Sequence, residues 1–537
     1  MTRYFEVVRR CGAARLGKLE LEEKIKTPYI ITSDSLSKGK FVIPPEDVHI
    51  LKAAKLLDND SRKLISTITK IRDKIPPDTA LYTPALARPE NLALLIYLGV
   101  DLVDDIIPTI QSYQGIYLTR EEEIELNELK DLLCPCKVCS SHSIDEMRDD
   151  ESFELLLAHN LAIFKTECEV IRHRIANGCM REYFEYKCRL KPYLTEALRL
   201  LDHEYNYLER RIPIVRRREL IVSSIESLNR VEVRRFIERV KTRYKPHAGV
   251  LLLLPCSKRK PYSRSKTHRQ IIDMLKGKRS RLHEVILTSP LALVPRELEL
   301  IYPAAHYDTP VTGRWFEEEL NLIRESLTSL LERGDYHDMI VHVSGDLIEV
   351  CREVGEEFEI ELHTTVEEGR ELSHISLDNL RSKVAELVTP DVPQVITKRD
   401  IVSDTLDYQF GTGAGELFLE GDIEIKGRIG SCSVFDRRNN VALGRMIPDY
   451  GFMALTVEGA GRLLDLGTYQ VEIDDFIPRG SVLAPGVIVA DSQIRPGDEV
   501  LICGEKVFGC GKAVMSGWEM EEANRGIAVE VRGVRVE

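Results

Sequence analysis

The chain has 537 residues, which is too long for one hydrophobic core, so several domains are expected. Its net charge of −13 argues against a surface covered with nucleic-acid-binding cations, and 43% hydrophobic with 30% charged residues is typical of a soluble globular protein. The longest apolar runs have only the length of a strand, and no signal-peptide segment is visible, so we expect a cytoplasmic protein without membrane contact. Twelve cysteines in a reducing compartment favour metal binding or catalysis over disulfide bonds.

The first part of the chain, up to about residue 165, mixes short strands, helices and proline-bounded turns. "TPALARPENLALLIYLGVDLVDDI" predicts a loop, an amphipathic helix and then a strand, an order typical of α/β folds. From Thr166 to Tyr244, apolar residues recur every three or four positions among charged ones, which predicts long helices.

A cluster of metal-binding residue types follows the predicted strand. "CPCKVC" brings Cys134, Cys136 and Cys139 together, and His159 follows in "LLLAHNLAIF". Three thiolates and one imidazole complete a tetrahedral zinc site with no open position, so we expect structural Zn²⁺ rather than catalysis. Free cysteines in a surface loop are the alternative.

Two stretches near this cluster, "GAARLGKLELEEKIKTP" and "LGVDLVDDIIPTIQSYQGIYLT", resemble the tRNA-guanine transglycosylase family of zinc-containing (β/α)8-barrel enzymes. By position, Asp104 matches the nucleophilic aspartate of that family. The two stretches lie much closer together than in a full barrel, and the Ser-Gly-Gly-Phe-Gln base pocket of the family is missing. The resemblance therefore implies a shortened TIM-barrel-like domain that is inactive and holds tRNA or forms a homodimer.

Between about residues 246 and 395, strands such as "GVLLLLP" and "DMIVHVSGD" alternate with helices, which predicts an open, parallel α/β sheet. Ligands of such sheets bind beyond the carboxyl ends of the strands, where polar loops follow here. Residues 258–281 contain ten Lys or Arg and one acidic residue, a density that suits a polyanion. A solvated basic loop is the alternative reading, and the RNA-binding candidates on this loop are Lys258, Arg259 and Arg264.

Beyond the proline-containing linker "TPDVPQVITKRD" the chain becomes rich in strands and turns. "RGSVLAPGVIVADSQIRPGDEVLICGEKVFGCGKAVMSGWEM" resembles the PUA domain, a small β-barrel found on RNA-modifying enzymes. "YQFGTGAGELFL" and the residues after it resemble the domain that precedes PUA in archaeal tRNA-guanine transglycosylases. The resemblance implies binding of tRNA, with glycines that allow backbone to approach phosphate closely; the matching residues are Arg479, Gly480, Pro485, Gly486, Val487, Gly497 and Asp498.

The loop after "GVLLLLP" reads P-C-x3-K-P-Y-x2-S-x2-H, which is identified as the signature of the archaeosine synthase family; its members are Pro255, Cys256, Lys260, Pro261, Tyr262, Ser265 and His268. Together with the flanking segments the resemblance covers essentially the whole chain. It implies that the substrate is tRNA carrying 7-cyano-7-deazaguanine at position 15, in the D-arm. It also implies that nitrogen from free lysine or glutamine, with lysine favoured, is added to the nitrile. A radical-SAM partner enzyme would then complete archaeosine.

Addition of an amine to a nitrile requires activation of one or both partners. A thiolate of Cys256 would form a thioimidate that the amine displaces, and cations at Lys258 and Lys260 would lower the thiol pKa. His268 would protonate the imide nitrogen, while Tyr262 or Ser265 would donate hydrogen bonds to it. The alternative is that Cys256 only packs at the end of the strand and the aromatic rings stack on RNA.

Four further residues are candidates for binding the amino-acid donor or moving protons. Arg296 or Lys260 would bind the donor carboxylate, and Asp308 and Asp346 would hold its ammonium group. His306, in "PAAHYD", is as suitable a proton carrier as His268.

The predicted architecture is a multidomain α/β and α+β chain. Its expected domains are a transglycosylase-like domain with zinc site and helical extension (1–240), a central catalytic α/β domain (241–395), a small α+β domain (400–465) and a PUA barrel (466–537). Two other functions stay open: an active tRNA-guanine(15) transglycosylase that uses Asp104, and a non-catalytic tRNA-binding scaffold. A basic RNA-binding protein of low specificity is disfavoured by the acidic net charge.

Overall fold

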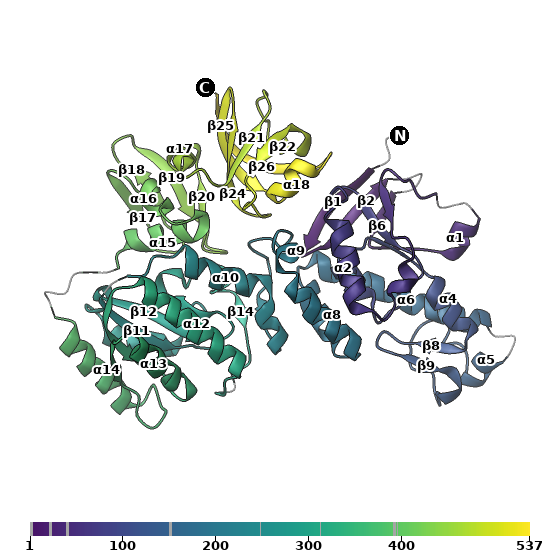
Figure 1. Ribbon diagram of the computed structural model, residues 1–537, viewed down its shortest axis with the longest axis horizontal. Helices are drawn as coiled ribbons and strands as arrows, with labels where there is room; N and C mark the ends of the chain where they lie inside the picture. The colour runs from purple at the N-terminus through teal and green to yellow at the C-terminus, as the bar shows by residue number, and fades with distance from the viewer. Residues whose placement is uncertain are drawn as a thin grey trace. The chain divides into compact units, whose positions relative to one another are not determined.

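The computed structural model describes residues 4–20, 24–38, 42–149, 153–247, 249–311, 313–389, 394 and 396–536. The chain divides into two compact units (Figure 1). Unit 1 comprises Met1–Arg218, Ser481–Pro496 and Val514–Ala528, and unit 2 comprises Glu219–Gly480, Gly497–Ala513 and Val529–Glu537. The predicted multidomain architecture of mixed α/β character is confirmed.

Unit 1 begins with an antiparallel sheet of order β1-β2-β3, followed by a parallel sheet of order β4-β7-β6-β5 and a hairpin of β8 and β9. Apolar side chains from both sheets, among them Phe5, Ile31 and Leu102, share one core. The strands are β1 (Tyr4–Cys11), β2 (Ala14–Glu20), β3 (Lys24–Thr27), β4 (Tyr29–Ile31), β5 (Val48–Ile50), β6 (Ala80–Thr83), β7 (Leu102–Asp104), β8 (Ile116–Leu118) and β9 (Glu123–Glu125).

The helices of unit 1 include α3, in which every side chain is buried, and the long α6. The predicted order of loop, helix and strand in residues 83–106 matches α3 and β7. The helices are α1 (Ser33–Ser37), η1 (Ala54–Leu57), α2 (Ser61–Arg72), α3 (Leu92–Tyr97), α4 (Ile106–Tyr113), η2 (Leu126–Glu128), α5 (Ile144–Arg148), α6 (Phe153–Ala176), α7 (Met180–Cys188), α8 (Pro192–His203) and α9 (Tyr205–Glu209).

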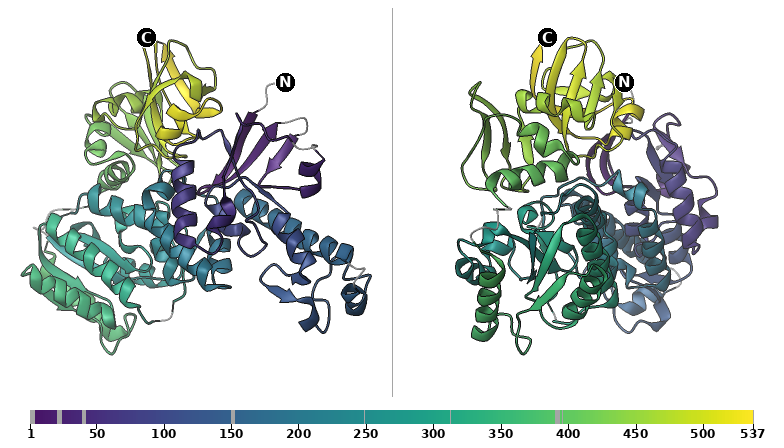
Figure 2. Two further views of the ribbon diagram at one scale, coloured as in Figure 1. Left: turned by 45° about the vertical axis from the view of Figure 1, so that its right-hand side comes forward. Right: turned by 60° about the vertical axis from the view of Figure 1, so that its left-hand side comes forward.

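The centre of unit 2 is a five-stranded sheet of order β13-β12-β11-β15-β16, parallel except for β13 at one edge. The leucine run of β11 occupies the middle of this sheet and is buried, because helices cover both faces (Figures 1 and 2). The strands are β11 (Gly249–Pro255), β12 (Leu282–Thr288), β13 (Ala292–Pro295), β15 (Tyr336–Val341) and β16 (Glu361–Thr364), with the separate short pair β10 (Leu220–Ile221) and β14 (Tyr307–Asp308).

Helices connect these strands as crossovers, an arrangement that parallel strands require. The helical elements of this part are η3 (Ile225–Asn229), α10 (Val231–Thr242), η4 (Tyr262–Arg264), α11 (Lys266–Met274), η5 (Arg279–Arg281), η6 (Arg296–Leu298), α12 (Glu317–Arg333), α13 (Asp346–Glu357) and α14 (His374–Leu387). None of the helices in the described part of the chain combines the length and apolar character that a bilayer crossing requires.

A small α+β segment follows in unit 2, with an antiparallel sheet β17-β18-β19-β20. Its elements are α15 (Lys398–Phe410), α16 (Ala414–Phe418), β17 (Ile423–Lys426), β18 (Ser433–Asp436), β19 (Val441–Met446), β20 (Met453–Leu455), α17 (Val457–Arg462) and η7 (Leu464–Leu466). The last segment contributes β21 (Gln470–Ile473), β24 (Glu499–Gly504), β25 (Val507–Ala513) and β26 (Ile527–Val536), and unit 1 contains β22 (Ser481–Leu483), η8 (Ala484–Gly486), β23 (Val487–Ala490) and α18 (Gly517–Glu522).

Candidate functional site

The loop after β11 carries all five predicted catalytic residues. Cys256 is the first residue beyond the carboxyl end of this central strand, and the loop then forms η4 and enters α11. Ser265 is the N-cap of α11 and accepts a hydrogen bond from the backbone N–H of His268 at 3.1 Å. The S-x2-H spacing therefore fixes where this helix begins.

Cys256 is half-buried at the end of the strand. Burial raises the pKa of its thiol, while Lys260 and a hydrogen bond with Thr288 act in the opposite direction. The sequence led us to expect a thiol pKa lowered by neighbouring cations; the structure differs because desolvation outweighs the effect of Lys260. Lys258, the other expected cation, is exposed to solvent.

Lys260 is the cation that interacts with this thiol. Its Nζ lies 4.0 Å from the centroid of the Tyr307 ring. Burial lowers the pKa of its ammonium group, whereas Cys256 and Asp308 raise it. Because the thiol pKa is raised and the ammonium pKa is lowered, the two values approach each other. The two side chains therefore interact electrostatically at the end of the strand.

A chain of buried hydroxyl groups lies behind the thiol. Tyr262 Oη is 2.6 Å from Tyr307 Oη, which is 2.6 Å from Thr288 Oγ1. Burial raises the pKa of Tyr262 well above its ordinary value, so its phenol keeps its proton. The chain links residues of η4, β14 and β12, and it provides hydrogen bonds near Cys256 without charge.

His268 and Arg296 belong to a buried network of ion pairs. His268 Nε2 lies 2.9 Å from the carbonyl oxygen of Pro255, and Arg296 Nη2 lies 2.8 Å from His268 Nδ1. Arg296 also pairs with Glu284 at 2.8 Å and with Glu299 at 2.9 Å. Burial, with Arg296 beside it, lowers the pKa of His268 to about 3, so the imidazole is neutral. The predicted roles of His268 in proton transfer and of Arg296 in substrate binding remain predictions.

A cavity of about 500 Å³ opens beside Lys260. Arg264 and His306 line it from the α/β part, and Arg428 and Ser431 line it from the loop between β17 and β18. The Nδ1 atom of His306 is buried and has no hydrogen-bond partner. Residues 428–431 were not among the predicted site residues, although the glycine-rich stretch "GRIGS" between two strands was an available signal for a loop.

Close backbone packing forms one wall of this cavity. Tyr302 donates a backbone hydrogen bond to the carbonyl oxygen of Tyr450 at 2.9 Å. A Cβ at Gly451, whose φ is +77°, would lie 2.3 Å from the carbonyl oxygen of Leu300, so only glycine allows the two segments to approach this closely. The segments 300–306 and 428–451 therefore enclose the cavity together.

The other predicted donor-binding residues lie on neighbouring elements. Asp308 ends β14 and is exposed, and Asp346 is exposed at the first position of α13, which follows β15. His342, which no sequence motif singled out, directly follows β15 and is fully buried. Its Nδ1 lies 2.8 Å from Thr365 Oγ1, its Nε2 has no partner, and burial lowers its pKa to about 4.

The predicted RNA-binding residues are on the surface. Lys258, Arg259 and Arg264 are exposed on the loop after β11, and Arg479 is exposed in the segment after β21. Gly480 has φ of +83° and accepts a hydrogen bond from the backbone of Val531 at 3.0 Å, and Gly486 closes η8. This placement leaves the cations accessible to phosphate groups.

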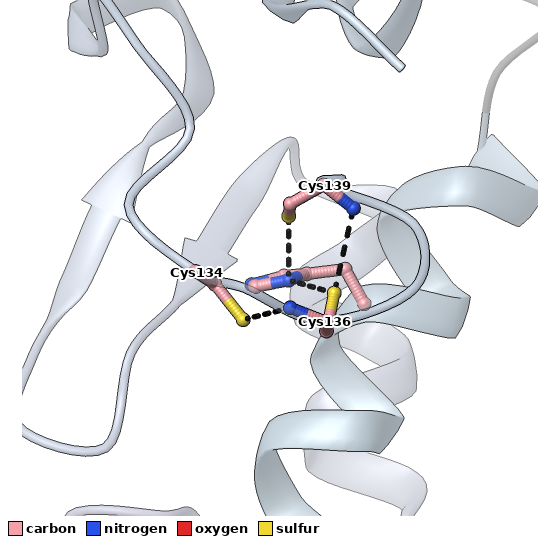
Figure 3. Close-up of side chains that lie close together, drawn as sticks. Cys134, Cys136 and Cys139 are labelled. Carbon is pink, nitrogen blue, oxygen red and sulfur yellow. Dashed lines mark hydrogen bonds between the residues drawn. The ribbon is translucent and has the colours of Figure 1, made fainter. Parts of the chain in front are cut away.

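The predicted metal ligands in unit 1 converge. Cys134, Cys136, Cys139 and His159 offer ligand atoms that all lie within 4.8 Å of one another. The three cysteines come from one loop, and their side chains lie close together (Figure 3). His159 comes from α6, with its Nδ1 at 3.5 Å from the sulfur of Cys136 and 3.2 Å from that of Cys139.

These side chains fit a tetrahedral zinc ion. Zinc–ligand bonds of about 2.0 to 2.3 Å separate neighbouring ligand atoms by roughly 3.5 Å, close to the distances found. His159 Nε2 lies 2.8 Å from the carbonyl oxygen of Leu118, so Nδ1 is left with its lone pair toward the thiols. Burial lowers the pKa of His159 and keeps the ring neutral, as a metal ligand requires.

Asp104, the candidate transglycosylase nucleophile, ends β7 and is 1% exposed. Its carboxylate accepts hydrogen bonds from the Tyr82 hydroxyl at 2.7 Å and from the backbone N–H groups of Ala85 and Ile106. These bonds tie β7 to the loop after β6, which gives Asp104 a structural role in the parallel sheet.

Family models match four consecutive parts of the chain. Residues 47–193 match queuine tRNA-ribosyltransferase, residues 233–384 a domain of unknown function (DUF5591), residues 400–469 the patch-forming domain C2 of tRNA-guanine transglycosylase, and residues 470–535 the PUA domain. The chain therefore combines an α/β domain that contains the Cys256 thiol with transglycosylase-like and RNA-binding segments. This combination defines the class of protein as a multidomain tRNA-modifying enzyme.

Two curated relatives match over essentially the full chain and a third over most of it. The archaeosine synthase subunit alpha of Methanosarcina acetivorans is 38% identical, and the match covers 100% of both chains. The archaeosine synthase of Haloferax volcanii is 34% identical over 99% of this chain and 100% of the relative. The tRNA-guanine(15) transglycosylase of Methanothermobacter thermautotrophicus is 28% identical over 88% of this chain and 68% of the relative. The chain belongs to the archaeosine synthase family.

Proposed function

We propose that the chain adds the amine nitrogen of an amino acid to the nitrile of 7-cyano-7-deazaguanine at position 15 of tRNA. Lysine is the favoured donor and glutamine the alternative. The observation that carries the proposal is the pairing of Cys256 with Lys260 beside a cavity bordered by exposed cations. This arrangement suits an electrophile that arrives attached to an RNA backbone.

The proposed reaction has two steps whose atoms balance. The sulfur of Cys256 adds to the nitrile carbon, and the thiol proton passes to the nitrile nitrogen, giving a thioimidate. The donor amine then attacks the same carbon, the carbon–sulfur bond breaks, and the thiolate recovers a proton from the nitrogen. The product is an amidine that contains the whole donor. Lys260, with its lowered pKa, is placed to move the proton to and from sulfur.

Other parts of the site would assist these steps. His306, which lines the cavity, would move protons there. His268, Ser265 and Arg296 would hold the loop in shape through their hydrogen bonds and ion pairs. Asp308 and Asp346 would bind the donor ammonium, and Arg264 would bind phosphate.

The segments on either side of the α/β domain would recognise the tRNA. The parallel sheet β4-β7-β6-β5 is the shortened TIM-barrel-like part, which holds tRNA or pairs two chains into a homodimer. The ligand set Cys134, Cys136, Cys139 and His159 would hold structural Zn²⁺, which fixes the cysteine loop to α6. A radical-SAM partner enzyme would convert the lysine adduct to archaeosine.

Mass analysis of nucleosides tests the proposal. Purified protein is incubated with tRNA that carries 7-cyano-7-deazaguanine, and lysine and glutamine are supplied in separate reactions. We expect a mass gain of one whole lysine on the modified base. Cys256→Ser should abolish this gain, while the matched control Cys503→Ser, a half-buried cysteine of β24, should retain it.

Each other outcome selects a different function. Archaeosine formed from glutamine alone would make the chain a complete amidotransferase. Release of the modified base would indicate transglycosylase activity through Asp104. Unchanged tRNA with both donors would favour the scaffold, in which the protein binds tRNA without reacting.

A further inference from the structure

A second cluster of metal-binding residue types lies in unit 2, away from the cysteines. His247, Glu297 and Asp404 each offer one ligand atom, and these atoms all lie within 4.8 Å of one another. His247 Nε2 is 2.9 Å from an Asp404 carboxylate oxygen. No motif in the sequence joins these residues, because they come from distant positions.

Three different elements meet at this cluster. His247 lies shortly before β11, Glu297 is in η6, and Asp404 is in α15. The cluster therefore connects the α/β sheet with the first helix of the small α+β segment. It lies toward the amino end of β11, whereas Cys256 follows the carboxyl end of the same strand.

The two carboxyl groups of the cluster are buried. Glu297 is 2% exposed and Asp404 is 4% exposed, and one imidazole faces both carboxyl groups. Burial raises the pKa of Glu297 to about 8 and that of Asp404 above its ordinary value. The hydrogen bond from His247 opposes this rise in the pKa of Asp404, and the exposed Lys245 opposes it more weakly. A carboxylate pair of this kind is costly to bury without a cation.

One carboxylate oxygen at the cluster lacks a protein partner. Glu297 Oε2 accepts a hydrogen bond from the Tyr244 hydroxyl at 3.2 Å, but Glu297 Oε1 is buried and has none. The neighbouring His283 is not available to it, because its Nε2 is 2.7 Å from the Tyr244 hydroxyl and its Nδ1 is 2.5 Å from that of Tyr336. A buried acceptor without a donor is uncommon in folded proteins and indicates an additional ligand.

We propose that His247, Glu297 and Asp404 bind one divalent transition-metal ion. One imidazole nitrogen and two carboxylate oxygens suit Zn²⁺, Mn²⁺ or Fe²⁺, and solvent completes the coordination. The ion compensates the buried charge and occupies the free lone pair of Glu297. Its position toward the amino end of β11 makes it a structural link between the sheet and α15, separate from the reaction at Cys256.

Metal analysis of the full-length protein tests this proposal. The protein is stripped with a chelator, reloaded with Zn²⁺ or Mn²⁺ alone, dialysed and assayed for bound metal. We expect one more zinc ion per chain in the wild type than in His247→Ala or Asp404→Asn. Asp338→Asn, which alters a half-buried group of acidic and histidine side chains on β15 and β16, is the matched control and should lose no metal from this site.

Two further measurements separate this site from the cysteine cluster and from misfolding. With Co²⁺, the thiolate charge-transfer band of the cysteine site should persist in His247→Ala while the total bound cobalt falls by one ion. Zn²⁺ should raise the unfolding temperature of the stripped wild type more than that of stripped His247→Ala. Equal metal content in the wild type and His247→Ala, or an equal rise in unfolding temperature, would overturn the proposal. The buried carboxyl groups of Glu297 and Asp404 would then be stabilised by a shared proton instead of a metal ion.

Discussion

Lys260 places its ammonium nitrogen 4.0 Å from the centre of the Tyr307 ring, and the hydroxyl group of the same ring contacts Tyr262 and Thr288. One aromatic side chain thus positions the cation that faces the Cys256 thiol and also closes the hydroxyl chain behind it. The ring and the hydroxyl group can be removed separately, which allows their effects on the site to be distinguished.

Tyr307→Phe keeps the ring beneath Lys260 and removes only the hydroxyl group. Tyr307→Leu removes both, and the cation–π contact contributes about 0.5 to 2 kcal/mol. We therefore expect Leu to slow amidine formation several-fold more than Phe. Single-turnover rates with the modified tRNA check this order, and equal rates for the two variants would contradict a role of the ring.

The reactivity of Cys256 should rise with pH into the alkaline range, because burial raises the pKa of its thiol. Lys260 lowers this pKa, so Lys260→Met should move the rise to still higher pH. The rate of alkylation of Cys256 by iodoacetamide as a function of pH measures this directly. Lys258→Met, a change at an exposed neighbour, is the control and should leave the profile in place. A shift to lower pH in Lys260→Met would contradict the assigned geometry.

The ion pairs of Arg296 should matter for stability. Arg296→Met leaves the buried Glu299 without its ion-pair partner and Glu284 with Arg279 alone, and we expect a loss of about 3 to 5 kcal/mol in the free energy of unfolding. Arg352→Met, which breaks an exposed pair with Glu349, is the control and should cost less than about 1 kcal/mol. Denaturant unfolding of both variants provides the comparison, and similar losses would argue against the network.

His268 should make stability depend on pH in the acid range. Its pKa is lowered to about 3 in the folded state, so the unfolded chain binds a proton more readily. Its contribution is fully present above the unfolded pKa, about 6.5, and is lost as pH falls from there toward 3. Unfolding of His268→Gln should show a weaker loss of stability over this interval than the wild type, and an unchanged slope would contradict the buried neutral state.

The exposed cations of the loop should contribute to tRNA affinity through phosphate contacts. Lys258→Ala and Arg259→Ala should each weaken binding and reduce the slope of log affinity against log salt by about one. Lys383→Ala, a change in a surface ion pair on α14, is the control. Filter binding at several salt concentrations measures the slopes, and unchanged slopes in the loop variants would exclude this surface.

The features that could be predicted from the sequence alone are those whose residues are close together in the chain or recur at a regular spacing. The cysteine cluster with His159, the buried strand β11 and the polar loop after it were readable because their residues are neighbours or follow a regular period. The α/β sheet was expected to be parallel, and β13 adds an antiparallel edge strand that the spacing of the strands did not reveal.

The remaining features depend on tertiary packing. The raised pKa of the Cys256 thiol follows from burial, which the basic sequence around it does not indicate. Arg296 could be chosen from the sequence as a candidate site residue. Its ion pairs with Glu284 and Glu299 could not be predicted, because they depend on how η6 packs against the sheet. The cavity wall at Arg428 and the group of His247 with Asp404 join residues from distant parts of the chain. The glycine-rich stretch around Arg428 marks a loop, but periodicity and spacing do not show which distant residues such a loop or His247 will meet.

The most direct measurement is the mass of the modified nucleoside after single-turnover reaction of the wild-type protein with 7-cyano-7-deazaguanine tRNA and isotopically labelled lysine. We expect that one complete labelled lysine becomes attached to the base and that Cys256→Ser fails to attach it. A base of unchanged mass with both lysine and glutamine, while tRNA still binds, would contradict the proposed addition to the nitrile.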